Sequence, residues 1–440
     1  MNILFVSNDL IAGNLAYLMT QEGHSVKLFI QDKDRRKNFG NLVEKTTNWR
    51  KELTWVGKNG LIVFDDVGFG KDQKELRKAG YAVAGGSELG DKLENDRQYA
   101  DKIFSDYGIK TMPLKDFSGI DQAITFLKKN KGPWVIKQNG HASKSFNCVG
   151  LFPDNCDTIN VLENYKKNNK KDLPVVTLQK KIIGVEIGVG RYFNGHDWTG
   201  PIELNIEYKR FFPGDLGPNT GEMGTVAWYD NNEKNKLFQE TIAKLKPYLQ
   251  KIDFRGDFEI NFIINKDGAW PLEPTPRFGS PIVHLQSELN NSPWAKFLNA
   301  VARGQNYKMN WKRGYGLVLL LAVPPLPYAV KIPGVSSEGI NIIFDKEVKN
   351  KMEHIHFEEV SSQNKKSSDS QLYISDSRGF VIYVTEVGKT IEEVREKVYG
   401  IAQHIHVPKM FYRQDIGLSF ANDGINQLKK FGYSSILPRL

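Results

Sequence analysis

The stretch "DFEINFIINKDGAWPLEPTPRFGSP", residues 257–281, decides the fold. Two runs of alternating apolar residues flank Asp267-Gly268, a dipeptide typical of the tight turn between antiparallel strands. The sequence therefore predicts a β-hairpin with Glu259 on the incoming strand and Glu273 on the outgoing strand, within a residue or two of being cross-strand neighbours. Thr275 lies two residues past Glu273 and is expected on the same face of the hairpin.

Paired carboxylates on facing strands have two interpretations. They can form a solvated edge on which the acids pair with nearby lysines. They can also form a magnesium site, because Mg²⁺ prefers one or two carboxylates plus waters and substrate phosphates to a complete protein cage. Lys137, which ends the apolar strand "PWVIK" at residues 133–137, is either a solvated strand end or a cation that neutralises phosphate. Spacing alone leaves these alternatives open.

The first third of the chain alternates apolar strands with an amphipathic helix. Strands are predicted over residues 2–6, 26–30 and 61–64, with a helix over 12–22 between the first two. This βαβ pattern predicts a parallel sheet with ligand chemistry at the carboxyl ends of its strands. The loop after the first strand lacks G-x-G-x-x-G, so a dinucleotide site is unsupported. The βαβ pattern ends before a long helical stretch predicted over residues 93–108. The first domain boundary is expected at the start of this stretch.

The middle of the chain is predicted to form mainly strands and loops. Strands at 133–137 and 148–152 predict a hairpin, and two further strands at 175–180 and 185–192 carry Gln179 and Glu186. A helix is expected over 232–250. Before it comes "GPNTGEMG", residues 217–224, whose glycines would let backbone N–H groups approach an anion closely.

Composition narrows the class of protein. The 440 residues suggest about three domains, at roughly 150 residues each. The 60 basic residues exceed the 51 acidic ones, but the lysines are scattered among acids, so nucleic-acid binding is not expected. No Cys/His spacing suits zinc. Neither a signal peptide nor a long apolar segment is evident, so a cytoplasmic protein with no membrane partner is expected.

Four ordered stretches are recognisable together. They are "VIKQNGHA" (135–142), "EYKRFFPGDLGPNTGEMG" (207–224), "LEPTPRFGSP" (272–281) and "VREKVYGIAQHIHVPKMFYRQDIG" (394–417). With them the chain resembles the phosphoribosylamine-glycine ligase family of the ATP-grasp superfamily over nearly its whole length. The resemblance implies an α/β fold: an N-terminal parallel-sheet α/β domain (1–92), an ATP-grasp unit (93–315) with a small lid at about 118–188, and a C-terminal α+β domain (316–440).

The resemblance also implies an activity and its residues. It implies an ATP-dependent carboxylate-amine ligase of purine biosynthesis, which forms an amide through an acyl phosphate and acts on small molecules as a monomer or homodimer. Its cofactors would be ATP and Mg²⁺ (or Mn²⁺). The implied catalytic residues are Arg277 and Lys137, and the implied metal ligands are Glu259, Glu273 and Thr275. ATP contacts are implied for Lys137, Lys144, Ser145, Gln179 and Glu186, and substrate contacts for Asn219, Thr220, Gly221, Glu222, Arg277 and Gly279.

Several residues depart from the family pattern. Thr275 stands where the family has asparagine, and Glu222 replaces a glycine. Ser280 and Ile282 replace acidic residues of the family, and the lid tip "HASKSFN" (141–147) has fewer glycines. The first loop, "SNDLIAGNLA" (7–16), lacks the arginine and histidine with which the family meets the phosphoribosyl substrate.

These departures leave two classes of function. One is a ligase, either of the family's own type or one that joins a different amino acid or amine to a phosphoribosyl, ribosyl or nucleotide substrate. The other is a nucleotide-binding protein that has lost turnover. Retention of Glu259, Glu273, Lys137 and Arg277 favours the enzyme. Because Asp9 in the first loop would repel a phosphate dianion, we expect that glycine with phosphoribosylamine is not the best substrate pair.

Overall fold

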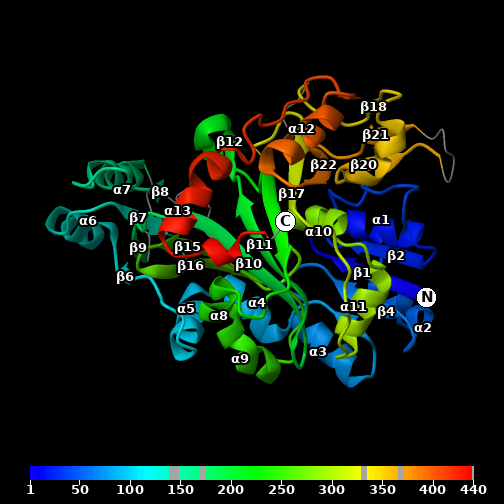
Figure 1. Ribbon diagram of the computed structural model, residues 1–440, viewed down its shortest axis with the longest axis horizontal. Coiled ribbons are helices and arrows are strands. Elements are labelled where there is room, and N and C mark those ends of the chain that lie inside the picture. The colour runs from blue at the N-terminus through cyan, green and yellow to red at the C-terminus, as the bar shows by residue number, and fades with distance from the viewer. Residues whose placement is uncertain (138–147, 169–174, 329–333, 365–370, 439–440) are drawn as a thin grey trace.

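The computed structural model describes residues 1–137, 148–168, 175–328, 334–364 and 371–438 (Figure 1). These residues form a parallel sheet near the N-terminus, a large antiparallel sheet in the centre and a small sheet at the far side. No helix in these ranges is both long and apolar enough to cross a membrane.

The first sheet is parallel and has the strand order β3-β2-β1-β4-β5. Its strands are β1 (Asn2–Ser7), β2 (Ser25–Ile30), β3 (Glu44–Lys45), β4 (Leu61–Phe64) and β5 (Val83–Ala84). The helices around it are α1 (Gly13–Gln21), α2 (Leu53–Val56) and α3 (Gly70–Lys78). The apolar runs of β1 and β4 are buried, as expected for strands covered on both faces. The predicted parallel sheet is confirmed.

The single helix predicted over 93–108 is wrong, because the chain forms two helices there. They are α4 (Glu88–Asn95) and α5 (Arg97–Asp106), separated by Asp96 in an extended conformation. The Asp96 carboxylate accepts a hydrogen bond from the Tyr99 N–H at 3.0 Å. This N-cap starts a new helix where the periodicity alone suggested continuity.

The large sheet is antiparallel and has the strand order β16-β15-β10-β11-β14-β17-β22-β19. Its strands are β10 (Val185–Asn194), β11 (Trp198–Glu207), β14 (Gly224–Asp230), β15 (Arg255–Asn265), β16 (Gly268–Thr275), β17 (Tyr315–Ala322), β19 (Ile355–Phe357) and β22 (Phe380–Gly388). Helices α10 (Ile282–Leu289), α11 (Trp294–Ala302), α12 (Ile391–Ala402) and α13 (Ile425–Lys430) pack around it. The sheet continues across the expected boundary at residue 315, so the limits of the domains remain a proposal.

The helix predicted over 232–250 is also wrong as one element. The chain forms α8 (Lys236–Glu240), the 3-10 helix η4 (Ile242–Leu245) and α9 (Lys246–Lys251). Thr241 leaves helical geometry with φ −127° and ψ −106°. Pro247, in the first turn of α9, lacks the N–H that a continuous helix would need.

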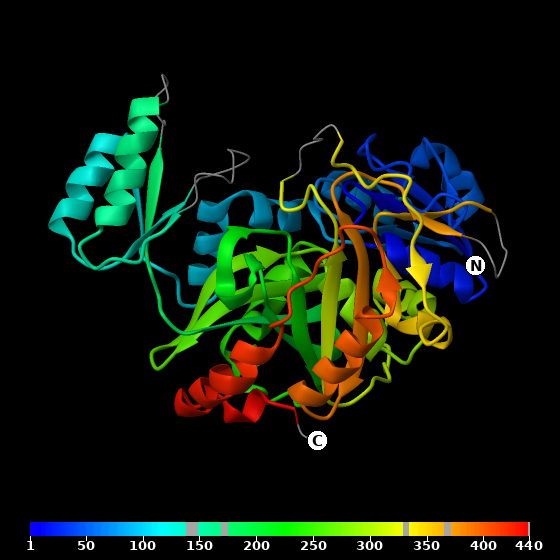
Figure 2. The same ribbon diagram turned by 90° about the horizontal axis from the view of Figure 1, so that it is seen from above.

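The small sheet has the strand order β6-β9-β7-β8 and stands apart from the rest of the molecule (Figure 2). Its strands are β6 (Leu114–Phe117), β7 (Trp134–Lys137), β8 (Cys148–Val149) and β9 (Val176–Lys180), with helices α6 (Ile120–Lys129) and α7 (Cys156–Asn168). Val135 pairs with Val149, which confirms the predicted hairpin. Ile136, Leu162 and Leu178 belong to a separate hydrophobic core, so this lid has its own packing.

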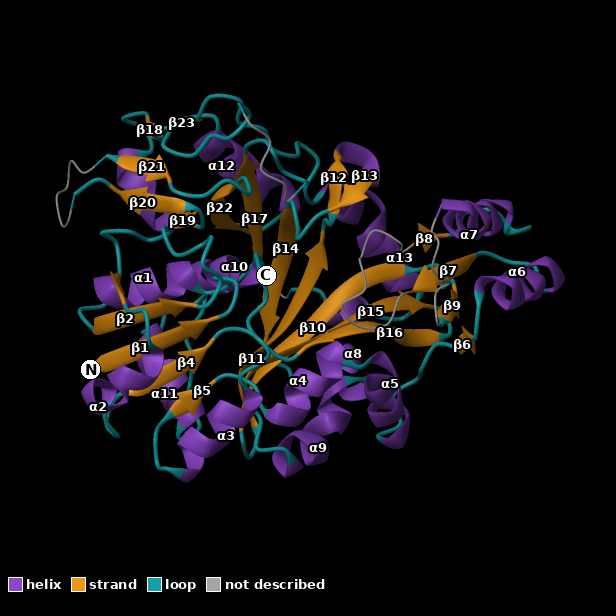
Figure 3. Ribbon diagram, turned by 180° about the vertical axis from the view of Figure 1, so that it is seen from behind, coloured by secondary structure: helices purple, strands orange, loops and turns teal. Residues whose placement is uncertain are grey.

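Among the described residues, three short strand pairs complete the fold: β12 (Arg210–Phe212) with β13 (Leu216–Asn219), β18 (Ile343–Phe344) with β23 (Ile405–His406), and β20 (Val360–Ser362) with β21 (Leu372–Ile374). Figure 3 shows β19 and β20 close to α1 and β2. The Phe39 N–H donates to the Val360 carbonyl at 2.8 Å, and the Ser362 N–H donates to the Gly40 carbonyl at 2.9 Å. These hydrogen bonds join the N-terminal unit to the strands near residues 355–362, along a contact called the seam.

Candidate functional site

The predicted hairpin forms with the expected register. Glu259 pairs with Thr275, and Asn261 pairs with Glu273. Because cross-strand partners share a face, both glutamates and Thr275 lie on the same side of the sheet. Asn265 pairs with Gly268, whose φ of 120° suits glycine at the end of the turn.

Lys209, which directly precedes β12, lies at the centre of the carboxylates. Its Nζ is 2.8 Å from Glu207, 3.0 Å from Glu273 and 3.4 Å from Glu186. Burial alone would lower the pKa of Lys209, but the charges of these three glutamates raise it well above its usual value. The acids thus pair with a lysine, as one interpretation of the sequence expected. Residue type and spacing predict no role for Lys209 or Glu207, although both lie in the family-like stretch 207–224.

Glu273 is ionised and half-exposed. The charge of Lys209 lowers the pKa of Glu273 to about 2. Lys137 lies at the end of β7 and interacts electrostatically with Glu273. Burial, together with the charge of Arg97, lowers the pKa of Lys137 to about 8. The charges of Glu273 and Glu186 act on Lys137 in the opposite direction. The lid strand and the large sheet therefore bring opposite charges to a common region.

Glu259 has a different environment. It is buried, and its Oε1 accepts a hydrogen bond from the Asn205 amide at 2.9 Å. Burial, and after it the charge of Glu207, raises the pKa of Glu259 to about 8. The Gln286 amide donates to both Glu203 and Asp257 at 2.8 Å, so Glu259 extends a row of buried acids. The pKa of Glu259 thus lies above neutral pH, whereas Glu273, paired with Lys209, is an ionised carboxylate.

Oxygen donors suited to a divalent cation surround Lys209. Glu207 Oε2 lies 2.9 Å from the Asn261 amide nitrogen and 2.8 Å from Lys209 Nζ. Glu273 faces Glu207 across the same lysine. Carboxylates with room for phosphate oxygens are the donors that Mg²⁺ prefers, so the side chains present fit this ion.

The loop at 217–224 approaches this cluster. Thr220 donates to the Lys209 carbonyl through its N–H at 2.7 Å and through its hydroxyl at 2.8 Å. Glu222 is buried and accepts a hydrogen bond from the Thr225 hydroxyl. Burial and the charge of Glu207 raise the pKa of Glu222 well above its usual value. Asn219 is exposed at the end of β13, and Gly221 follows Thr220 in the loop.

Arg277 joins the end of the hairpin to the N-terminal sheet. Its Nη2 lies 3.0 Å from Glu94 of α4, and its Nε lies 3.6 Å from Asp66, which follows β4. Its Nη1 also donates to the Phe278 carbonyl at 2.8 Å, and Gly279 then leads into α10. Gln179 is buried on β9, and Glu186 lies near the start of β10. Lys144, Ser145 and the rest of the lid tip lie outside the described residues.

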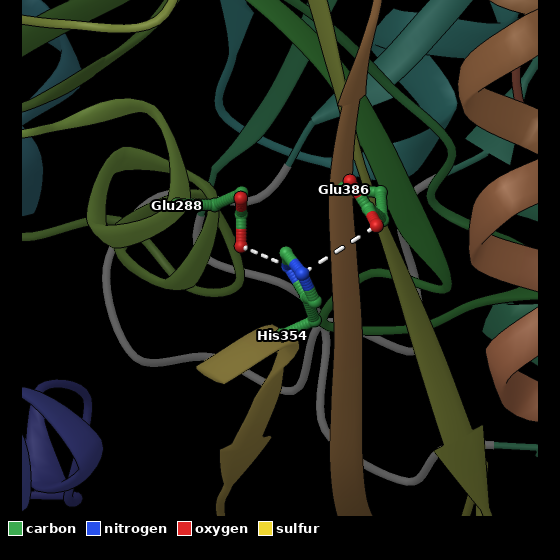
Figure 4. Close-up of side chains that lie close together, drawn as sticks. All are labelled: Glu288, His354 and Glu386. Atoms are coloured by element: carbon green, nitrogen blue, oxygen red, sulfur yellow. Dashed lines mark hydrogen bonds and ion pairs between the residues drawn. The ribbon is translucent and has the colours of Figure 1, made fainter. Parts of the chain in front are cut away.

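In a separate cluster, His354 lies between Glu288 of α10 and Glu386 of β22 (Figure 4). His354 Nδ1 lies 2.9 Å from Glu288, and His354 Nε2 lies 3.5 Å from Glu386. Lys312 also pairs with Glu288. Burial would lower the pKa of His354, but the hydrogen bond with Glu288 raises it, and the pKa of Glu288 falls to about 2. Because these side chains already pair as ions, the cluster serves as a link between α10 and the C-terminal strands.

The chain is similar in sequence to known proteins. The ATP-grasp (A) domain of phosphoribosylglycinamide synthetase matches residues 95–282, and the C domain of the same synthetase matches residues 331–419. The phosphoribosylamine-glycine ligase of Clostridium acetobutylicum is 25% identical over 393 residues, which cover 86% of this chain and 87% of that one. The corresponding ligase of Helicobacter pylori strain J99 is 27% identical over 355 residues, or 78% of each chain.

Solved structures support the same fold. The phosphoribosylamine-glycine ligase of Thermotoga maritima has a TM-score of 0.72 at 19% identity and covers 95% of this chain and 100% of its own. N5-carboxyaminoimidazole synthetase of Staphylococcus aureus has a TM-score of 0.56 at 14% identity, covering 91% of this chain and 97% of its own. The predicted fold, an N-terminal parallel-sheet α/β unit, an ATP-grasp unit with a small lid and a C-terminal α+β unit, is confirmed.

Proposed function

Because the chain belongs to the phosphoribosylglycinamide synthetase family, we propose that it is an ADP-forming ligase that joins a carboxylate to an amine. The carboxylate attacks the γ-phosphate of ATP, which forms an acyl phosphate and releases ADP. The amine then forms the C–N bond as the C–O bond to phosphate breaks. The observation that carries this proposal is Lys209 held among Glu186, Glu207 and Glu273, whose charges act on Lys137 at the end of the lid strand.

The charged residues have roles that follow from their positions. Lys137 and Lys209 would neutralise phosphate oxygens, and in a site that excludes water such fixed charges stabilise the charge that develops during phosphoryl transfer. Glu273, with Thr275 beside it, would hold Mg²⁺ or Mn²⁺. When bound, the ion would add positive charge at the phosphates.

Two carboxylates are candidates for the second metal ligand. Glu259 shares the face of Glu273, but it is buried and has a pKa of about 8, so a metal would have to displace its proton. Glu207 lies beside Glu273 around Lys209 and is the better placed of the two. We therefore propose Glu273 and Glu207 as the principal carboxylates, with Glu259 in support.

The remaining sequence-derived residues complete the proposed site. Gln179 and Glu186, together with Lys144 and Ser145 of the lid, would contact the nucleotide. The carboxylate substrate would lie between the loop and the end of the hairpin, where its proposed contacts are Asn219, Thr220, Gly221, Glu222, Arg277 and Gly279. We also propose a cytoplasmic location and a monomer or homodimer acting on small molecules. The place in purine biosynthesis follows only if the amine is phosphoribosylamine.

The decisive experiment follows oxygen from the carboxylate. With an ¹⁸O-labelled amino acid and a panel of amines, an acyl phosphate intermediate transfers one ¹⁸O into the released phosphate. We expect this transfer together with ADP release that depends on both substrates. ATP binding without ADP release across the panel would instead support a nucleotide-binding protein that has lost turnover.

A further inference from the structure

The N-terminal sheet has a switch point between β1 and β4. From β1 the chain runs outward through β2 and β3, then returns to place β4 on the other side of β1. In open α/β sheets, ligands bind beyond the carboxyl ends of the strands at such a point. The loops that follow β1 and β4 touch each other, because the Ala12 N–H donates to Asp65 Oδ2 at 2.8 Å.

Carboxylates gather around this switch point. They come from the loops after β1, β2 and β4, from α4 and from two C-terminal segments, and they are Asp9, Asp32, Asp65, Asp66, Glu94, Glu358, Glu359 and Asp376. Three arginines face them, namely Arg35, Arg277 and Arg378. The acids outnumber the arginines, so the site carries a net negative charge.

Each of these arginines is engaged by carboxylates. Arg35 is buried and lies 2.8 Å from Glu358, 3.4 Å from Asp9 and 3.4 Å from Asp376. Arg378 lies 2.8 Å from Asp9 and also pairs with Asp32. A phosphate ester entering the site would have to compete with these acids for every guanidinium, at a cost in charge repulsion.

Buried polar atoms at the site lack partners. Glu358 Oε2 and His284 Nε2 lie 3.9 Å apart, and neither forms a hydrogen bond with any residue that the structure describes. Asp65 Oδ1 is likewise buried without a hydrogen bond from the described residues. A buried carboxylate oxygen without a hydrogen bond is destabilising, so this site favours a ligand that brings several N–H donors.

Burial raises the pKa values of two acids at the switch point. Burial, followed by the charge of Asp66, raises the pKa of Asp65 to about 7. Burial also raises the pKa of Glu358 to about 7 against the opposing effect of Arg35, while the charge of Asp9 adds to the rise. A bound cation would keep these carboxylates ionised and would be held by them in return.

The site is continuous with the proposed centre of phosphoryl transfer. Arg277 contacts Asp66 at the switch point and Glu94 on α4, and it lies on the same segment as Glu273. Burial raises the pKa of Glu94 against the opposing effect of Arg277, and the charges of Asp66 and Glu273 add to the rise. An amine held at the switch point would thus lie next to the carboxylate-activating site.

We propose that the switch-point site binds the amine acceptor and that this acceptor is an unphosphorylated molecule with a second ammonium group, of the diamine or diamino acid class. The inference rests on the proposed ligase function. One nitrogen must be uncharged to attack the acyl phosphate, and its proton leaves with the phosphate. The second, charged nitrogen pairs with the half-exposed Asp9 and with Oε2 of Glu358, whose other oxygen, Oε1, stays paired with Arg35. The relatives are named for phosphoribosylamine, whose phosphate this site would repel.

Calorimetry on the full chain, saturated with Mg²⁺ and a non-hydrolysable ATP analogue, tests the inference with two probes. We expect 1,4-diaminobutane to bind at least tenfold more tightly than ribose 5-phosphate, and added salt to weaken it. Asp9→Asn should weaken the diamine at least fivefold, and Glu358→Gln should do the same. Asp34→Asn, an exposed acid in the same unit, is the matched control and should change nothing. Tighter binding of ribose 5-phosphate, or unchanged diamine binding in Asp9→Asn, would overturn the proposal.

Turnover separates this inference from the ligase proposal. ADP release with ribosyl phosphate amines but not with diamines would retain the ligase and reject the acceptor class. Diamine binding that is lost in Asp9→Asn, without ADP release in the wild type for any carboxylate, would retain the site and reject the ligase. Asp9 is half-exposed in a loop, so its variant tests the site even if Glu358→Gln fails to fold.

Discussion

Lys209 Nζ lies 3.0 Å from Glu273 Oε1, so a cation proposed to neutralise phosphate is held by the carboxylate proposed to bind the metal. Both side chains are partly exposed, at 27% and 56%. An ion pair this open to solvent contributes about 1 kcal/mol or less. Lys209 can therefore exchange Glu273 for a phosphate, and Glu273 can exchange Lys209 for a metal ion, at a small cost in free energy.

Removing the charge of Glu273 should disrupt the metal site without disrupting the fold. We expect Glu273→Gln to lower turnover by about 100-fold or more and to raise the Mg²⁺ concentration needed for half-maximal rate, because a neutral amide replaces a charged ligand. Steady-state ADP release against Mg²⁺ measures both, with circular dichroism to check folding. Glu163→Gln, an exposed glutamate of α7, is the control. Unchanged turnover in Glu273→Gln would reject the metal role.

Lys137 should make nucleotide affinity depend on pH. Its pKa of about 8 means that the free protein loses this charge as pH rises above that value. A phosphate favours the protonated lysine, so the affinity for MgATP should be highest below pH 8. Above pH 8 it should fall by up to about tenfold per pH unit. Titrations from pH 6.5 to 9.5 test this, and Lys137→Arg should flatten the profile because arginine stays charged. An equal slope in both proteins would contradict the assignment.

Thr275 should limit the affinity for the metal. Its hydroxyl is a weaker neutral ligand than the amide oxygen that the related family carries at this place. Thr275→Asn is expected to lower the half-saturating Mg²⁺ concentration severalfold, while Thr275→Val should raise it, since valine keeps the shape but removes the oxygen. Nucleotide-dependent Mg²⁺ titration by calorimetry distinguishes the variants. Identical titrations for all three proteins would place Thr275 outside the metal site.

Asn14 should matter for stability rather than for chemistry. Its amide contacts His356 Nδ1 at 3.0 Å, and its Oδ1 accepts a hydrogen bond from the Phe357 N–H at 2.9 Å. Asn14→Ala leaves both buried partners unpaired, so we expect the free energy of unfolding to fall by about 2–4 kcal/mol. Urea unfolding measures the change, with Gln21→Ala, exposed at the end of the same helix, as control. A loss no larger than in the control would show that the seam does not depend on Asn14.

Local pattern was sufficient for much of the fold. The hairpin around Asp267 forms as predicted, because alternation and a tight turn specify strands within a few residues. The same reasoning failed where one side chain interrupts a periodic stretch. Asp96 caps a new helix, and Thr241 leaves helical geometry after α8, so the continuous helices predicted from apolar spacing are divided. A cap or a single non-helical residue acts locally, and periodicity does not reveal it.

The candidate site was only partly predictable. The sequence placed Glu259 and Glu273 on one face, but their opposite protonation depends on neighbours from other strands: Asn205 and Glu207 beside Glu259, and Lys209 beside Glu273. Burial is a property of the packed sheet. The pKa of a carboxyl group follows burial and nearby charge, so residue type and spacing alone could not separate the two glutamates.

The sequence by itself determined the parallel N-terminal sheet, the hairpin with its two glutamates and the ATP-grasp type of fold, because these follow from local periodicity and from motifs that lie in order along the chain. Only the tertiary structure decided which charges meet. Arg35 reaches Glu358 across 323 positions of sequence, and Arg277 joins Asp66 to Glu94. Electrostatic energy depends on distance through space and on burial, and neither is encoded in the neighbourhood of a residue along the chain.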